Sequence, residues 1–154
     1  MTKNPTAAPG LRAMTPADYD AVLALWQSSE GIGLNESDTR EAIAAYLARN
    51  PGFSLVAETE GVIVGALLCG HDGRRGYLHH LAVASPHRRR GLGRTLVDES
   101  IARLRAQGIT KCNIFLFANN AAGRTFWLRQ GWAPREDLVV VQKAISASAF
   151  SNAC

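Results

Sequence analysis

One stretch of this chain, residues 81–104, constrains its fold more than any other. An apolar run at 81–83 precedes a turn that contains Gly91 and Gly93, and apolar residues then recur at helical spacing as far as Leu104. This order predicts a strand that enters a helix through a tight turn. Glycine lets a backbone approach an anion closely, and the first amides of a helix lack partners within the helix. The turn is therefore predicted to bind a phosphorylated ligand.

Basic residues gather beside this turn. The chain has 17 Lys and Arg residues against 13 Asp and Glu residues, a formal net charge of +4. The clustered arginines are Arg74, Arg75, Arg88, Arg89, Arg90 and Arg94. A nucleic-acid surface is usually broader, with interleaved aromatic residues or a known recognition motif, and neither is present. The cluster indicates a local anion site, and no nucleic-acid partner is expected.

Length and composition indicate one ordinary globular domain. Of the 154 residues, 47% are hydrophobic and 19% are charged. We expect a disordered N-terminal segment at residues 1–10, a single domain at 11–145 and a flexible tail at 146–154. No apolar run reaches about 18 residues, so no membrane span is expected. Cys69 and Cys112 lie in apolar runs, which favours a reducing compartment and hence the cytoplasm.

Periodicity and turn signals predict the order of the elements. Thr15 and Asp18 form a predicted capping box for a first helix, and Asp38 with Glu41 is predicted to cap a second. Strands are expected at 11–14, 53–58, 62–69, 77–84, 111–117 and 138–144, and further helices at 92–104 and 120–130. The strand at 111–117 is expected to be buried. It follows its predecessor through a helix, so those two strands are predicted to be parallel in an otherwise mostly antiparallel sheet.

Three segments then carry a family resemblance. Arg88, Gly91 and Gly93 match the pattern Arg or Gln, two residues, Gly, one residue, Gly or Ala. The run 81–83 precedes it at the expected distance, and 120–132 has the order Asn, short helix, aromatic, then Gly-aromatic. Over residues 11–145 the chain resembles the GNAT superfamily of acyl-CoA-dependent N-acyltransferases, especially small bacterial single-domain members. The resemblance implies an α/β (α+β) fold with helices on both sheet faces and a V-shaped splay between two parallel central strands.

The same resemblance implies acetyl-CoA as co-substrate and assigns residues to it. Backbone groups of Leu81 and Val83 would hold the pantetheine arm, and the amides of 89–94 would hold the pyrophosphate. The candidate coenzyme A residues are Leu81, Ala82, Val83, Arg88, Arg89, Arg90, Gly91, Leu92, Gly93, Arg94, Asn120 and Trp127. No metal is expected, because the histidines and cysteines lack the spacing of metal ligands.

His79 is the candidate general base. Relatives often place His or Glu on the strand before the turn, and counting back from Leu81 in steps of two gives His79 and Tyr77. This count predicts that both share a face with Leu81 and Val83. The alternative is that His79 is an ordinary core or surface histidine. His80 is expected to point the other way and to pack or form a hydrogen bond.

The proton donor to the leaving thiolate differs from that of many relatives, because Trp127 stands where they have a tyrosine. Indole cannot supply a proton near neutral pH, so water or Tyr77 is the expected donor. Trp127 is expected to pack against the pantetheine arm or the core. A non-catalytic module that binds or senses acyl-CoA is the alternative function to an N-acetyltransferase.

The acceptor is expected to be a primary amine of a small molecule or peptide. The segment 26–41 usually forms one wall of the acceptor pocket in this family, and here it is acidic, which would attract a cationic amine. Trp26 and Glu30 are the candidate substrate residues. The alternatives are a core role for Trp26 and a solvated surface role for Glu30. Dimers through the late strands are frequent in the family, so a homodimer is a further expectation.

Overall fold

A five-stranded sheet forms the centre of the protein, whose computed structural model describes residues 8–146. The sheet order is β1-β2-β3-β4-β5, in which β1 to β4 are antiparallel and β5 is parallel to β4. The strands are β1 (Gly10–Ala13), β2 (Leu55–Thr59), β3 (Val62–His71), β4 (Gly76–Val83) and β5 (Cys112–Ile114). The predicted fold class and the parallel pair are confirmed.

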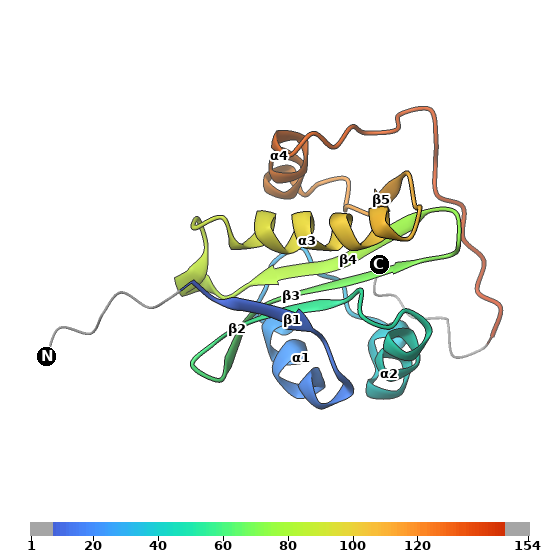
Figure 1. Ribbon diagram of the computed structural model, residues 1–154. Coiled ribbons are helices and arrows are strands. Elements are labelled where there is room, and N and C mark those ends of the chain that lie inside the picture. The colour runs from blue at the N-terminus through green and yellow to red at the C-terminus, as the bar shows by residue number, and fades with distance from the viewer. Residues whose placement is uncertain (1–7, 147–154) are drawn as a thin grey trace, which may run out of the picture.

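Helices cover both faces of the sheet (Figure 1). On one face lie α1 (Tyr19–Gln27) and α2 (Arg40–Arg49), and on the other α3 (Leu92–Ala106), with α4 (Ala121–Arg129) beyond it. Short 3-10 turns precede α1 and α2 and follow β4. None of the helices described is long and apolar enough to cross a membrane.

Local sequence signals account for most of these boundaries. The predicted capping box of Thr15 and Asp18 is present ahead of α1. Glu60 and Gly61 both have positive φ, as a two-residue hairpin turn between β2 and β3 requires. The cap of α2 differs from the prediction, since the Thr39 side chain accepts from Ala42 N. Asp38 instead accepts hydrogen bonds from the Asn35 amide and His80.

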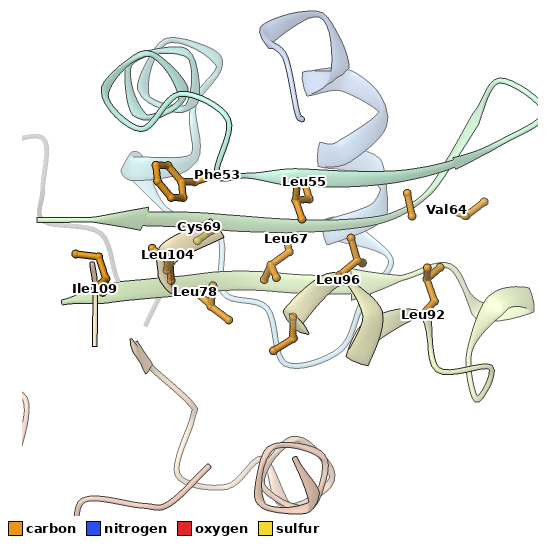
Figure 2. Packing of buried hydrophobic residues seen from close by; sticks show 12 residues of the cluster. Phe53, Leu55, Val64, Leu67, Cys69, Leu78, Leu92, Leu96, Leu104 and Ile109 are labelled. Carbon is orange, nitrogen blue, oxygen red and sulfur yellow. The ribbon is translucent and has the colours of Figure 1, made fainter. Parts of the chain in front are cut away.

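The sheet separates two hydrophobic clusters. One lies between the sheet and α3 and includes Leu67, Leu78, Leu96 and Leu104 (Figure 2). The other packs α1 and α2 on the opposite face and includes Trp26. Burial of large side chains on both faces, at about 25 cal/mol per Å² of apolar area, holds β3 and β4 rigidly in the middle of the molecule.

One extra residue interrupts β4 and reverses its faces. His79 pairs with Leu68 and Ala82 with Ala66, so His80 and Leu81 together oppose a single residue of β3, and His80 has φ 56°. Leu78 consequently packs in the α3-side cluster and Ala82 in the α1-side cluster, although regular alternation would give them one face. The prediction that His79 and Tyr77 share a face with Leu81 and Val83 is therefore wrong.

The C-terminal part of the sheet is smaller than predicted. The strand expected at 111–117 is only three residues long, and it ends before Phe115, which is 60% exposed rather than buried. The strand expected at 138–144 is absent, and Val139 and Val141 are exposed. A strand requires a neighbouring ladder, and this run pairs with none of the residues described.

The two predicted terminal segments lie largely outside the residues that the structure describes. Most of the expected N-terminal segment (1–7) and nearly all of the expected tail (147–154) lie outside the described residues. β1 begins at Gly10, inside the segment expected to be disordered, because Gly10 pairs with Glu58 of β2.

Candidate active site

A groove opens where β4 and β5 diverge. Their pairing ends at Leu78 and Ile114, and beyond that point a cavity of about 900 Å³ separates the strands. Residues 78–83 line one side and 114–116 the other, while the turn before α3 and the start of α4 complete it. We call this cavity the cofactor groove. Its place between two parallel strands gives the V-shaped splay that the family resemblance implies.

Past Leu78, where the pairing of β4 with β5 ends, β4 directs backbone groups into this groove. The Ala84 amide donates to Val64 O, at 2.8 Å, so the amide and carbonyl of Val83 point away from β3. Arg88 Nε donates to that carbonyl at 2.9 Å. Of the two Val83 backbone groups expected to hold a pantetheine arm, the carbonyl is thus already hydrogen-bonded and the amide is the one directed to the groove.

The turn before α3 forms a cradle suited to an anion. Arg89 has φ 62° and Gly91 φ 78°, and these left-handed residues turn the chain into the N-terminus of a 15-residue helix. Arg88, Arg89 and Arg94 line the groove beside those amides, whereas Arg90 does not. Unpartnered amides, the helix dipole and forked cations together fit a diphosphate.

The remaining motif residues have packing roles. A Cβ on Gly93 would lie 3.3 Å from the Phe126 ring, so the absence of a side chain there lets α4 approach α3. Leu92 is 8% exposed and belongs to the core. Leu81 and Ala82 line the groove, but Ala82 is buried on the α1 side of the sheet.

The loop after α1 closes the far end of the groove. A Cβ on Gly31 would lie 2.7 Å from Asn120 Nδ2, so this loop rests on the start of α4. Asn120 also caps α4 by accepting from Gly123 N at 2.9 Å. Glu30 and Trp127 line the groove, and the Trp127 indole packs edge-on against Trp132.

A second cavity, of about 650 Å³, lies on the α2 side of the sheet. It is lined by 35–38, by one face of α2 that includes Tyr46 and Arg49, and by Leu68. Its lining shares two residues with the cofactor groove, His79 and His80. These two histidines therefore stand at the junction of the cavities.

His79 lies in an aromatic stack. Its ring is stacked 6.4 Å from Tyr77 and 6.0 Å from Phe115, and Tyr46 meets it edge-on at 6.5 Å. Burial lowers the pKa of His79, the nearby His80 lowers it further, and Asp38 opposes the shift. The imidazole is accordingly neutral over a wider pH range than free histidine and can accept a proton.

His80 forms a hydrogen bond, as expected from the sequence, but its partner, Asp38, was not predicted. Its Nε2 lies 2.9 Å from Asp38 Oδ1, and its carbonyl accepts from Trp26 Nε1 at 3.0 Å. Trp26 is 1% exposed and lines neither cavity, so its placement favours the core role. Asp38 and His80 are 42 positions apart in the sequence. The one sequence signal for the pair was the position of His80 on a predicted strand.

Comparison with known proteins identifies the family. Residues 19–132 match the model of the acetyltransferase (GNAT) family. The chain belongs to the GNAT family. It is therefore an acyltransferase of a family that uses acetyl-CoA.

Relatives and solved structures agree with this membership. An acetyltransferase of Yersinia enterocolitica is 32% identical over 112 residues, 73% of this chain and 79% of that relative. The crystal structure of Ard1 from Thermoplasma volcanium has a TM-score of 0.73 at 21% identity, covering 82% of this chain and 84% of that one. PaiA N-acetyltransferase from Thermoplasma acidophilum, in complex with coenzyme A, has a TM-score of 0.72 at 16% identity, covering 80% and 89%. These structures share the GNAT fold.

Proposed function

We propose that this GNAT protein transfers an acetyl group from acetyl-CoA directly to a primary amine of a small molecule or peptide. The observation that carries the proposal is that, among the residues described, His79 and His80 line both the cofactor groove and the second cavity. Two substrates that enter separately would meet beside imidazoles. Proximity of this kind makes a reaction with an activated acyl group effectively unimolecular.

The cofactor groove is assigned to coenzyme A. Its turn offers amides at 89–94, its arginines offer charge, and β4 offers the Val83 amide to an extended arm. A structure of the same fold holds coenzyme A, which supports the assignment. The thioester supplies an already activated acyl group, so the chain's residues need only to orient it and to move protons.

His79 is the proposed proton acceptor for the reacting nitrogen, directly or through water. Its neutral imidazole borders both cavities, as a base between two substrates should. Tyr77 packs beside His79 but lines neither cavity, so water is the proposed proton donor to the leaving thiolate. Trp127 lines the groove as an apolar wall.

The second cavity is the proposed acceptor site, and we call it the acceptor cavity. Glu36 lines it and Glu30 lines the adjoining groove, and both carboxylates would attract a cationic amine. Free Cys69 and Cys112 support the cytoplasm as the compartment. The exposed run 138–141 and the outer edge of β5 support a homodimer.

A panel of primary amines tests the proposal, with release of free thiol from acetyl-CoA as the readout. We expect saturable turnover of at least one amine and binding of coenzyme A by calorimetry. Coenzyme A binding without turnover of any amine would favour the acyl-CoA-binding module. No heat of binding at millimolar coenzyme A would overturn both.

A further inference from the structure

We propose that His80, oriented by Asp38, is a second proton acceptor that converts the incoming ammonium into the nucleophilic amine. This inference rests on the proposed function, because it assigns a step of that reaction. It is carried by four observations on the described residues: a part-buried hydrogen bond between His80 and Asp38, a ring nitrogen without a hydrogen-bond partner, a strained backbone and a position at both cavities.

Asp38 fixes which nitrogen of His80 can accept a proton. Asp38 is 7% exposed and also accepts from the Asn35 amide at 3.1 Å, as a carboxylate does. A carboxylate only accepts, so Nε2, at 2.9 Å, carries the ring hydrogen. Nδ1 is then the basic nitrogen, and it makes no hydrogen bond to any residue between 8 and 146.

The backbone holds His80 in a costly conformation. A φ of 56° is uncommon for a residue with a side chain, and strain of this kind is concentrated at functional sites. The Trp26 indole holds the His80 carbonyl, and its ring meets the imidazole edge-on at 5.0 Å. The imidazole is therefore fixed from two sides, while it lines the acceptor cavity and the cofactor groove.

The acceptor nitrogen must lose two protons during the reaction, and each of the two histidines is proposed to accept one of them. An alkylammonium ion has a pKa near 10 and must lose one proton before its nitrogen can attack. His80 Nδ1 takes that proton and releases it through the acceptor cavity to solvent. The nitrogen then forms a bond to the acetyl carbon, His79 takes the second proton from nitrogen, and the bond from carbon to sulfur breaks. One proton returns to the thiolate, so the net release is a single proton.

Two amines that differ in charge test this division. Ethylamine is almost fully protonated at neutral pH, whereas trifluoroethylamine is almost fully neutral and needs no first deprotonation. We expect His80→Gln, which keeps a donor toward Asp38, to lower kcat/KM for ethylamine by at least about tenfold. For trifluoroethylamine the expected change is less than about threefold, and the affinity for coenzyme A should stay the same.

Asp38→Asn is the second variant, and it keeps the shape of the pair. Its amide would favour the other imidazole tautomer and place a hydrogen on Nδ1, so the same amine-dependent loss is expected. His71→Gln is the control, because His71 lines neither cavity. Equal losses with both amines, or no loss with either, would overturn the inference alone. A wild-type protein that binds coenzyme A but acetylates neither of these amines nor any in the panel would overturn the proposed function.

Discussion

At the scale of single residues, the two glycines of the turn motif have separate tasks. Gly91 supplies a left-handed backbone with open space around its Cα, and Gly93 makes room for the Phe126 ring. The first task concerns the proposed approach of a ligand, and the second concerns the packing of α4 on α3. A substitution at each position should therefore affect different properties.

Gly91→Val should weaken binding of coenzyme A by at least about tenfold, because it forces a β-branched residue to positive φ beside the proposed diphosphate cradle. Isothermal calorimetry measures the affinity. Gly108→Val is the matched control, since Gly108 also has positive φ and open space but ends α3 at its other terminus. The assignment of the cradle fails if both variants bind coenzyme A as tightly as the wild type.

His79 gives the reaction a pH dependence with a defined direction. Its pKa is lowered from 6.5, so the neutral, proton-accepting form persists below that pH. The acidic limb of the kcat/KM profile should have its midpoint below 6.5, and His79→Gln should lower the plateau by roughly 10- to 100-fold. A midpoint above 6.5, or a variant that loses affinity for coenzyme A in proportion to activity, would contradict the role of His79.

At the scale of elements, Arg12 ties β1 to its neighbours. Its guanidinium donates two hydrogen bonds to Asp18, each 2.8 Å, and a third to Glu58 of β2. The Arg12 hydrogen bonds lower the pKa of Asp18 to about 2, against the effect of burial. The pair thus connects the capping box before α1 to the edge of the sheet.

Asp18→Asn should lower the free energy of unfolding by about 1 kcal/mol at neutral pH, a modest value because Arg12 is partly solvated. Asp18 titrates at about 2 when folded and near 3.8 when unfolded, so its contribution is present above pH 4 and lost as the pH falls toward 2. Urea titrations of both proteins across this range measure the difference. Asp20→Asn, at an exposed ion pair with Arg40, serves as control and should change stability by less than about 0.5 kcal/mol. A gap that persists at pH 2 would contradict the assignment.

Turns and helix ends were predicted well, because they depend on residues that are close together in the sequence. The turn before α3, the hairpin at 59–61 and the ends of α3 and α4 at Gly108 and Gly131 follow from glycine positions and apolar spacing. The bulge at His80 could not be found in this way, because it depends on the register between β3 and β4. The Asp38–His80 pair likewise depends on tertiary packing across 42 positions.

At the scale of the whole molecule, the run 138–141 exposes four apolar side chains and pairs with no strand of the described residues. Leu138, Val139, Val140 and Val141 are all at least 59% exposed, and residues 130–146 contain no helix or strand (Figure 1). β-branched composition predicted a strand here, and that prediction is wrong, because a strand forms only against a partner edge. β5 has such an edge on the side away from β4.

We expect a homodimer in which this run of one copy pairs with β5 of another, because both elements gain hydrogen bonds and bury apolar surface. Size-exclusion chromatography with light scattering should show a dimer for the wild type. Val139→Lys combined with Val141→Lys should give a monomer, whereas Val62→Lys, at an equally apolar but distant exposed site, should leave the dimer intact. A monomeric wild type at high micromolar concentration would exclude this assembly.

The additional residue in β4 changes which face of the sheet each side chain of the strand occupies. Downstream of it, the strand presents Leu81 and Val83 to the α3 side, and upstream it presents Tyr77 and His79 to the opposite side. With regular alternation, Leu78 and Ala82 would share one face, and His79 and Leu81 the other. The direction of the His79 side chain toward α2 therefore depends on one additional residue in β4.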